Sequence, residues 1–96
     1  MRLSQDHINI IKNTAKEIYG DVPVRLFGSR VDDVKKGGDI DLFIETKTDV
    51  SLQQKINFLV KLEKAGIERK VDLIVQSPSS KFEPIFETAK QTGIFL

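Results

Sequence analysis

The sequence predicts an α/β fold: a small mixed β-sheet with helices on one face and carboxylates on the other. Three observations lead to this prediction. Helical and strand-like segments alternate along the chain in the order α-β-α-β-α-β-α. The strand-like segments alternate apolar with polar side chains, as in a sheet whose core side is covered on one face. The length of 96 residues and the absence of cysteine fit a single domain, residues 1–96, without disulfides.

The two longer helices have clear start and stop signals. Ser4 is a favourable N-cap for the first helix, and Gly20 ends it. Ser51 and Gln54 form a capping box for the second helix, which we expect to reach about Ala65. The predicted core side of this second helix consists of Leu52, Ile56, Leu59, Val60 and Ile67, widened by Phe58, Leu62 and Ala65.

The predicted strands are residues 22–27, 39–45 and 70–76. Short helices are expected over 29–36 and 83–91, and the apolar residues 94–96 either fold back onto the core or reach a partner. No apolar run approaches a membrane span and no signal-peptide core is present, so we expect a cytoplasmic protein. A formal net charge of +1 and few aromatic residues give no support to direct nucleic-acid binding.

Aspartates gather at the starts of the second and third predicted strands. Asp39 and Asp41 point to one face of their strand, with Ile40 on the other. Asp72 lies opposite Val71 in the same way. If the two strands are neighbours, three carboxylates meet, and they raise one another's pKa unless a cation neutralises them. Two Mg²⁺ ions about 3.5–4 Å apart would clamp the attacking and leaving oxygens of an in-line displacement.

A Gly-Ser turn follows the first predicted strand. Gly28 lets the backbone approach a ligand closely, and Ser29 can cap a short helix whose free N–H groups bind an anion. Arg30 either adds positive charge there or pairs with Asp32 or Asp33. We therefore expect this turn to hold the triphosphate of a nucleotide. Neither a Walker A pattern nor G-x-G-x-x-G occurs, which excludes the P-loop and Rossmann alternatives.

Taken alone, an Asp-x-Asp pair is more typical of the solvated face of a sheet. Gly28-Ser29, nine intervening residues, Asp39-Ile40-Asp41 and a distal strand aspartate at Asp72 together resemble the nucleotidyltransferase superfamily that includes DNA polymerase beta. The short length resembles its minimal nucleotidyltransferase (MNT) branch. The resemblance covers roughly residues 4–75 and implies the palm-like fold of that superfamily.

The chain departs from the superfamily at two places. Many relatives have a small residue and a glycine after Gly-Ser-Arg, where this chain has Val31 and the acidic pair Asp32-Asp33. Many have serine before the first aspartate, where this chain has Gly38. Neither departure removes a metal ligand, but both leave the nucleotide preference open.

The resemblance also implies an activity, a site and a partner. The activity is transfer of a nucleoside monophosphate, AMP from ATP, to a hydroxyl group, and Asp72 would help to deprotonate that hydroxyl. The implied catalytic residues and ligands of two Mg²⁺ ions are Asp39, Asp41 and Asp72, and the implied nucleotide-binding residues are Gly28, Ser29 and Arg30. Small relatives in prokaryotes are commonly antitoxins paired with a helical HEPN toxin, so we expect a hetero-oligomer.

Two other functions stay open. The chain is either an antitoxin that acts by contact alone or a nucleotidyltransferase for small molecules, although relatives of the second kind usually carry a further helical domain. We expect no enclosure for a small acceptor, because the helices are needed to cover the sheet. A partner would then dock across the carboxylate face, with Phe58, Leu62 and residues 94–96 as candidate contacts. The acceptor's identity and the oligomeric state are not determined by the sequence.

Overall fold

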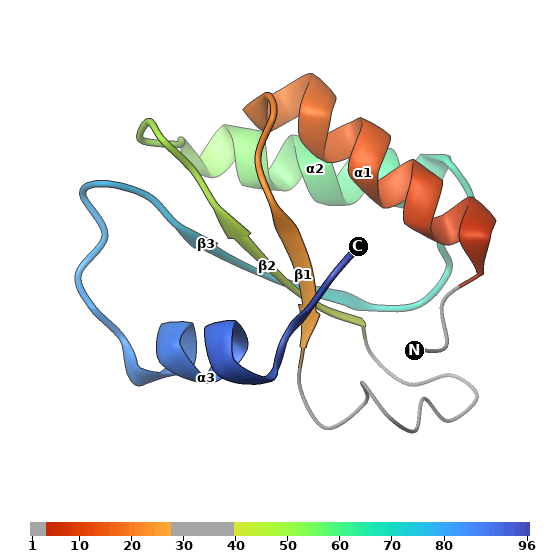
Figure 1. Ribbon diagram of the computed structural model, residues 1–96. Coiled ribbons are helices and arrows are strands. Elements are labelled where there is room, and N and C mark those ends of the chain that lie inside the picture. Colours follow the sequence, from red (N-terminus) through yellow and green to blue (C-terminus); the bar gives the residue numbers. More distant parts are fainter. Residues whose placement is uncertain (1–3, 28–39) are drawn as a thin grey trace.

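The computed structural model describes residues 4–27 and 40–96, which form helices on both sides of one β-sheet (Figure 1). The predicted short helix over 29–36 lies outside the described residues. The elements follow in the order α1 (Gln5–Tyr19), β1 (Val24–Phe27), β2 (Ile40–Glu45), α2 (Leu52–Lys64), β3 (Val71–Gln76), α3 (Pro84–Thr92) and β4 (Ile94–Phe95). No helix in the described ranges is long and apolar enough to cross a membrane.

The sheet is mixed, as the sequence predicts, and the described strands lie in the order β3-β2-β1-β4. β1 runs antiparallel to both β2 and β4. β2 and β3 are parallel, and the connection between them contains α2, as a crossover between parallel strands requires. This connection places β3 at one edge of the sheet and β2 inside it.

The helix ends confirm the predicted caps. The Ser4 hydroxyl accepts a hydrogen bond of 3.1 Å from the His7 amide. Gly20 has φ 88°, a conformation that glycine adopts at little cost, and its amide donates to Lys16 O. Ser51 and Gln54 form both hydrogen bonds of the capping box. Local sequence signals therefore determine where α1 and α2 begin.

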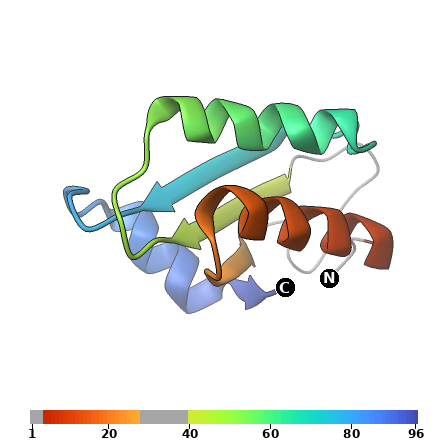
Figure 2. The same ribbon diagram turned by 90° about the horizontal axis from the view of Figure 1, so that it is seen from above.

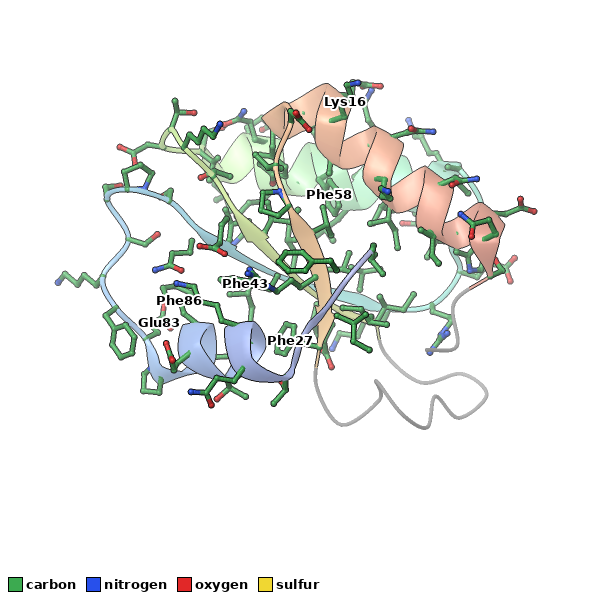
Figure 3. The ribbon with its side chains drawn as sticks, in the orientation of Figure 1. Lys16, Phe27, Phe43, Phe58, Glu83 and Phe86 are labelled. Carbon is green, nitrogen blue, oxygen red and sulfur yellow. The ribbon has the colours of Figure 1, made fainter. Side chains whose placement is uncertain are left out.

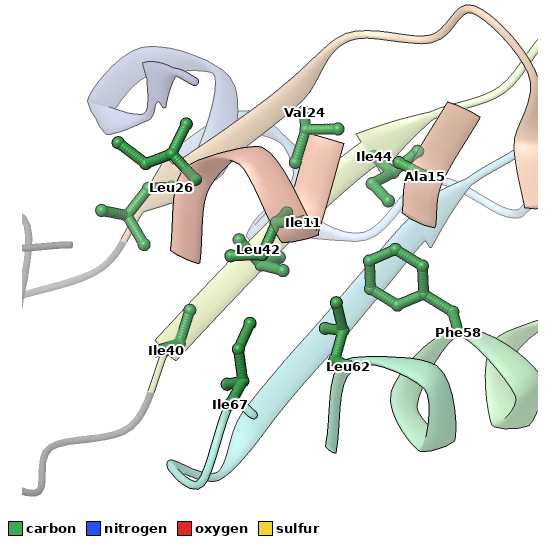
Figure 4. Packing of buried hydrophobic residues seen from close by; sticks show 11 residues of the cluster. Ile11, Ala15, Val24, Leu26, Ile40, Leu42, Ile44, Phe58, Leu62 and Ile67 are labelled. Atoms are coloured by element: carbon green, nitrogen blue, oxygen red, sulfur yellow. The ribbon is translucent and has the colours of Figure 1, made fainter. Parts of the chain in front are cut away.

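α1 and α2 cover one face of the sheet, and the larger hydrophobic cluster lies between these layers (Figures 2 and 4). The strand side chains on this face alternate regularly, because every second residue of β1 and β2 points into the cluster. The fully or nearly buried members are Ile8, Ile11, Ala15, Val24, Leu26, Ile40, Leu42, Ile44, Phe58, Leu62 and Ile67.

The buried side of α2 matches the predicted one in part. Phe58 and Leu62, which were expected to widen the core side, are 0% and 1% exposed, and Ile67 is 2% exposed. Leu52, Ile56 and Val60 were also expected in the core, but they are 71%, 44% and 41% exposed. The helix carries apolar side chains on two sides, because 3.6 residues per turn place Ile56 almost opposite Phe58. Only packing decides which side is covered. The expectation that Phe58 and Leu62 contact a partner is therefore wrong.

α3 lies on the opposite face of the sheet from α1 and α2, whereas the sequence predicted helices on one face only (Figure 1). A second cluster explains this position: Phe27, Phe43, Phe86 and Ala89 are buried there with Ile74 packed against them. Figure 3 shows Phe27, Phe43 and Phe86 between the strands and α3. Two phenylalanines on the carboxylate side of β1 and β2 need a cover, which α3 supplies.

The end of the chain folds back onto the protein, one of the two predicted outcomes, and does so as a strand. β4 pairs Phe95 with Arg25 and Ile94 with Leu26, and the Leu96 amide donates to Val24 O at 3.0 Å. Ile94 and Phe95 remain 39% and 60% exposed. β4 therefore extends the sheet beyond β1 while keeping apolar surface open to solvent.

Candidate active site

Asp41 and Asp72 lie side by side on neighbouring strands. The parallel register of β2 and β3 pairs Asp41 directly with Asp72. Ile40 and Leu42 on either side of Asp41 point into the α1/α2 cluster, and Val71 and Leu73 on either side of Asp72 pack against it. Both carboxylates therefore point to the other face of the sheet. The sequence predicted that Asp41 and Asp72 come together if their strands are neighbours, and the described part of the chain confirms that they do.

The remaining predicted site residues, Gly28, Ser29, Arg30 and Asp39, lie outside the described residues. Two described residues mark where they join the chain. Phe27, the last residue of β1, pairs with Asp41, and Ile40 pairs with Val71 next to Asp72. In the sequence, Gly28 and Ser29 directly follow Phe27, which pairs with Asp41. Asp39 directly precedes Ile40, which is the neighbour of Asp41. Their roles stay predictions.

Lys70 is a residue of this site that sequence reasoning missed. Its Nζ lies 3.8 Å from Asp72 Oδ1, with the side chains 71% and 47% exposed. Lys70 precedes β3 by one residue, and its carbonyl accepts a hydrogen bond of 2.9 Å from the Ile40 amide. The sequence could have predicted this contact, because Lys70 and Asp72 are two residues apart and such residues share one face of a strand.

The donor chemistry of the described residues fits a divalent cation. Mg²⁺ typically takes one or two carboxylates and fills its octahedron with water and substrate phosphates. Asp41 and Asp72 supply two carboxylates on one accessible face, and a cationic side chain already stands beside one of them. Within residues 4–27 and 40–96 there is no group of three or more such ligands, so Asp39 would be needed to complete a triad.

Next to the carboxylates, ion pairs and ring contacts join β1, β2, β4 and α3. Arg25 Nη1 lies 2.5 Å from Glu45 Oε1, and its guanidinium stacks over Phe43 and Phe95 at 5.7 and 4.3 Å from the ring centroids. Lys90 of α3 lies 3.6 Å from Glu45 Oε2. These contacts fasten α3 and β4 to the sheet. The carboxylates therefore lie on the face of the sheet where α3 and β4 are held by these contacts.

A cavity of about 480 Å³ lies where α2 ends and β3 begins. Apolar and charged side chains line it in equal number: Leu59, Leu62, Ile67 and Val71, with Glu63, Glu68, Arg69 and Lys70. Lys70 belongs both to this cavity and to the ion pair with Asp72. The hollow is open to solvent, and its apolar lining belongs to the α1/α2 side of the sheet, so the expectation that the chain encloses no small acceptor stays a prediction.

The chain matches the family model described as "Nucleotidyltransferase domain" over residues 8–93. It therefore belongs to the nucleotidyltransferase domain family, and the superfamily resemblance stated from the Gly-Ser and Asp-x-Asp residues is confirmed. A comparison with curated proteins found no match.

Solved structures of toxin–antitoxin proteins share the fold. One, described as a toxin–antitoxin with AMP-PNP, superposes with a TM-score of 0.74 at 18% identity, covering 96% of this chain and 72% of that one. Two mutant forms of the MntA–HpeT toxin–antitoxin superpose with TM-scores of 0.71 and 0.69 at 17% and 20% identity. They cover 91% and 93% of this chain and 69% of each of those. At these identities the likeness establishes the fold, and the nucleotidyltransferase fold expected from the sequence is confirmed.

Proposed function

We propose that this protein is a metal-dependent nucleotidyltransferase that transfers AMP from ATP to a hydroxyl group of a protein partner. The observation that carries the proposal is the direct pairing of Asp41 with Asp72 on one accessible face, in a chain of the nucleotidyltransferase family. Like charges on directly opposite residues of a strand pair repel each other, and a bound divalent cation would lower that repulsion.

The proposed reaction assigns each predicted residue a role. Asp39, Asp41 and Asp72 hold two Mg²⁺ ions, which when bound neutralise phosphate charge during the displacement. Gly28, Ser29 and Arg30 hold the β- and γ-phosphates. The acceptor oxygen forms a bond to the α-phosphorus, the bond from that phosphorus to pyrophosphate breaks, and Asp72 accepts the hydroxyl proton. Asp72 is suited to the last step, because its side chain is 47% exposed.

We further propose that the partner is a HEPN-type helical toxin and that the reaction takes place in the cytoplasm. Support comes from the toxin–antitoxin proteins that share the fold, one of them described with AMP-PNP. A partner docking across the carboxylate face would bring the acceptor hydroxyl to Asp72. Of the predicted contacts, residues 94–96 remain available, since Ile94 and Phe95 are exposed.

The test is co-purification with the product of the adjacent gene, followed by intact mass measurement after incubation with ATP and Mg²⁺. We expect the partner to gain one or more AMP units with the wild-type chain and none with Asp41→Asn. A stable complex without mass gain in either form would replace the proposal by an antitoxin that acts through contact alone.

A second candidate function, nucleotidyl transfer to a small molecule, is favoured by the cavity beside Lys70. It predicts pyrophosphate release from ATP with small hydroxyl compounds and no protein partner. Substituting Leu59→Trp at the cavity wall would then reduce turnover with the small acceptor. If the acceptor is a partner protein, the same substitution leaves the mass gain on that partner unchanged.

A further inference from the structure

We propose that Lys70 is a built-in counterion of the metal site: its ammonium group neutralises Asp72 when no metal is bound and must be displaced when a divalent cation enters. This inference rests on the proposed function, because it takes Asp72 to be a metal ligand. It assigns Lys70 a positioning role, through Asp72, that neither the motif nor the fold provides.

The backbone holds Lys70 at the entrance of the site. The 2.9 Å hydrogen bond from the Ile40 amide to Lys70 O fixes the main chain at the point where β2 and β3 begin to pair. Because Lys70 and Asp72 are two residues apart, their side chains leave β3 on the same face. The 3.8 Å between Nζ and Oδ1 places the ammonium group beside the carboxylate that neighbours Asp41.

The ion pair has no evident role in holding the fold together. Lys61 and Glu17 pair α2 with α1, and Glu45 of β2 receives Arg25 of β1 and Lys90 of α3. Those pairs join different elements. Lys70 and Asp72 belong to one strand and its first flanking residue, so their pairing crosses no packing interface. The main effect of the pair is therefore that the ammonium group of Lys70 partly neutralises the negative charge of Asp72.

The physical consequence is competition. An ammonium group and a divalent cation repel each other, and both are attracted to the same carboxylate oxygens. Lys70 is 71% exposed, so its flexible side chain can move into solvent when the cation binds. Lys70 therefore lowers the affinity of the site for a free metal ion. The phosphates of a nucleotide supply negative charge to the displaced ammonium, which favours binding of the metal and the nucleotide together.

The test is titration with Mn²⁺ in the absence of nucleotide, following the free ion by electron paramagnetic resonance. We expect Lys70→Ala to bind Mn²⁺ about 1.4- to 5-fold more tightly than the wild type, the range for an exposed ion pair. Lys70→Arg keeps the charge and should bind like the wild type. Lys64→Ala, which removes an exposed lysine from the last turn of α2, serves as the control for net charge and should change nothing.

A double-mutant cycle with Asp72→Asn decides whether Lys70 acts through Asp72. We expect Lys70→Ala to have no effect on Mn²⁺ affinity in the Asp72→Asn background. An equal shift in Lys70→Ala and Lys64→Ala, or an effect that persists without the Asp72 charge, overturns the inference alone. Equal Mn²⁺ affinity of the wild type and Asp72→Asn overturns the proposed metal site, and the inference with it. Circular dichroism of each variant establishes that it is folded.

Discussion

The two faces of the sheet use the same strands for different purposes. On the α1/α2 face the described side chains are aliphatic or aromatic and buried, and no described charged residue is buried among them. On the α3 face, Phe27 shares β1 with Arg25, and Phe43 shares β2 with Asp41 and Glu45. Because successive residues of a strand alternate between faces, β2 places Leu42 in the core and Asp41 beside Asp72. Stability and chemistry are thus set by alternate residues of one segment.

The largest expected effect concerns the face of the sheet that α1 and α2 cover. Phe58→Ala removes a fully buried ring and should lower the free energy of unfolding by about 3–5 kcal/mol. Ile56→Ala, on the opposite side of the same helix, should cost about 0.5 kcal/mol or less. Urea unfolding measures both. Equal losses would mean that the exposed side of α2 is also packed, and the contrast between covered and open surfaces would fail at this helix.

On the α3 face the carboxylates should affect activity and not stability. Asp72→Asn is expected to lower nucleotidyl transfer by more than about 100-fold, since even residues that only support a metal ligand cost about 10–100-fold. Its free energy of unfolding should change by less than about 1 kcal/mol, because the pair with Lys70 is exposed. Asp21→Asn, in the turn before β1, is the matched control and should keep full activity. An Asp72→Asn protein that unfolds would make this carboxylate structural.

Gly93→Ala tests the fastening of β4 to the α3 face. A Cβ at this position would lie 2.3 Å from Ala89 O and 3.1 Å from two carbons of Arg25. The backbone must shift, and we expect a loss of about 1–3 kcal/mol in urea unfolding. Thr92→Ala, whose side chain is exposed, should cost less. Normal stability and unchanged amide protection at Leu96 in Gly93→Ala would show that β4 tolerates looser packing.

The smallest effect concerns Tyr19, whose ring contacts that of Phe58 in a tilted arrangement, with 5.7 Å between the ring centroids. Burial raises the pKa of Tyr19 to about 12 from its ordinary value of 10.0. The folded state therefore holds the phenol proton more tightly than the unfolded state. The stability that depends on it is fully present below pH 10 and is lost as the pH rises towards 12.

Tyr19→Phe should remove this alkaline loss. It should also raise the stability at pH 7 by about 1 kcal/mol, because the buried hydroxyl has no hydrogen-bond partner among the described residues. Thermal unfolding of both proteins from pH 7 to pH 11 tests the expectation. An identical pH dependence in the two proteins would show that the hydroxyl is solvated.

Much of the fold was predictable because its signals are local. Ser4, Ser51 and Gln54 determine the helix starts through side-chain hydrogen bonds to nearby amides, so no tertiary information is needed. The pairing of Asp41 with Asp72 followed from strand parity and from the assumption that their strands are neighbours. Strand parity also places Phe27 and Phe43 on the carboxylate face, where α3 covers them. Two large apolar side chains on that face could therefore have predicted a helix there.

The rest depended on contacts that sequence order does not reveal. α2 has apolar side chains on two sides, and only the positions of α1 and the sheet decide that Phe58 is covered and Ile56 is not. β4 has two residues, too few for a pattern, and it depends on the stacking of Arg25 over Phe95. The cavity beside Lys70 arises from the way the end of α2 meets β3. Each of these is a tertiary effect.

The pairing of β4 with β1 has a consequence for the order of folding. β2, α2 and β3 are consecutive, so their contacts close short chain segments. Arg25 and Phe95 lie far apart in the sequence, with β2, α2, β3 and α3 between them, so their pairing has to close a much longer loop. The outer strand should therefore dock late, onto a core that already holds the carboxylate pair. Ile94 and Phe95 of β4 should then also be the first residues of the sheet to separate when the protein begins to unfold.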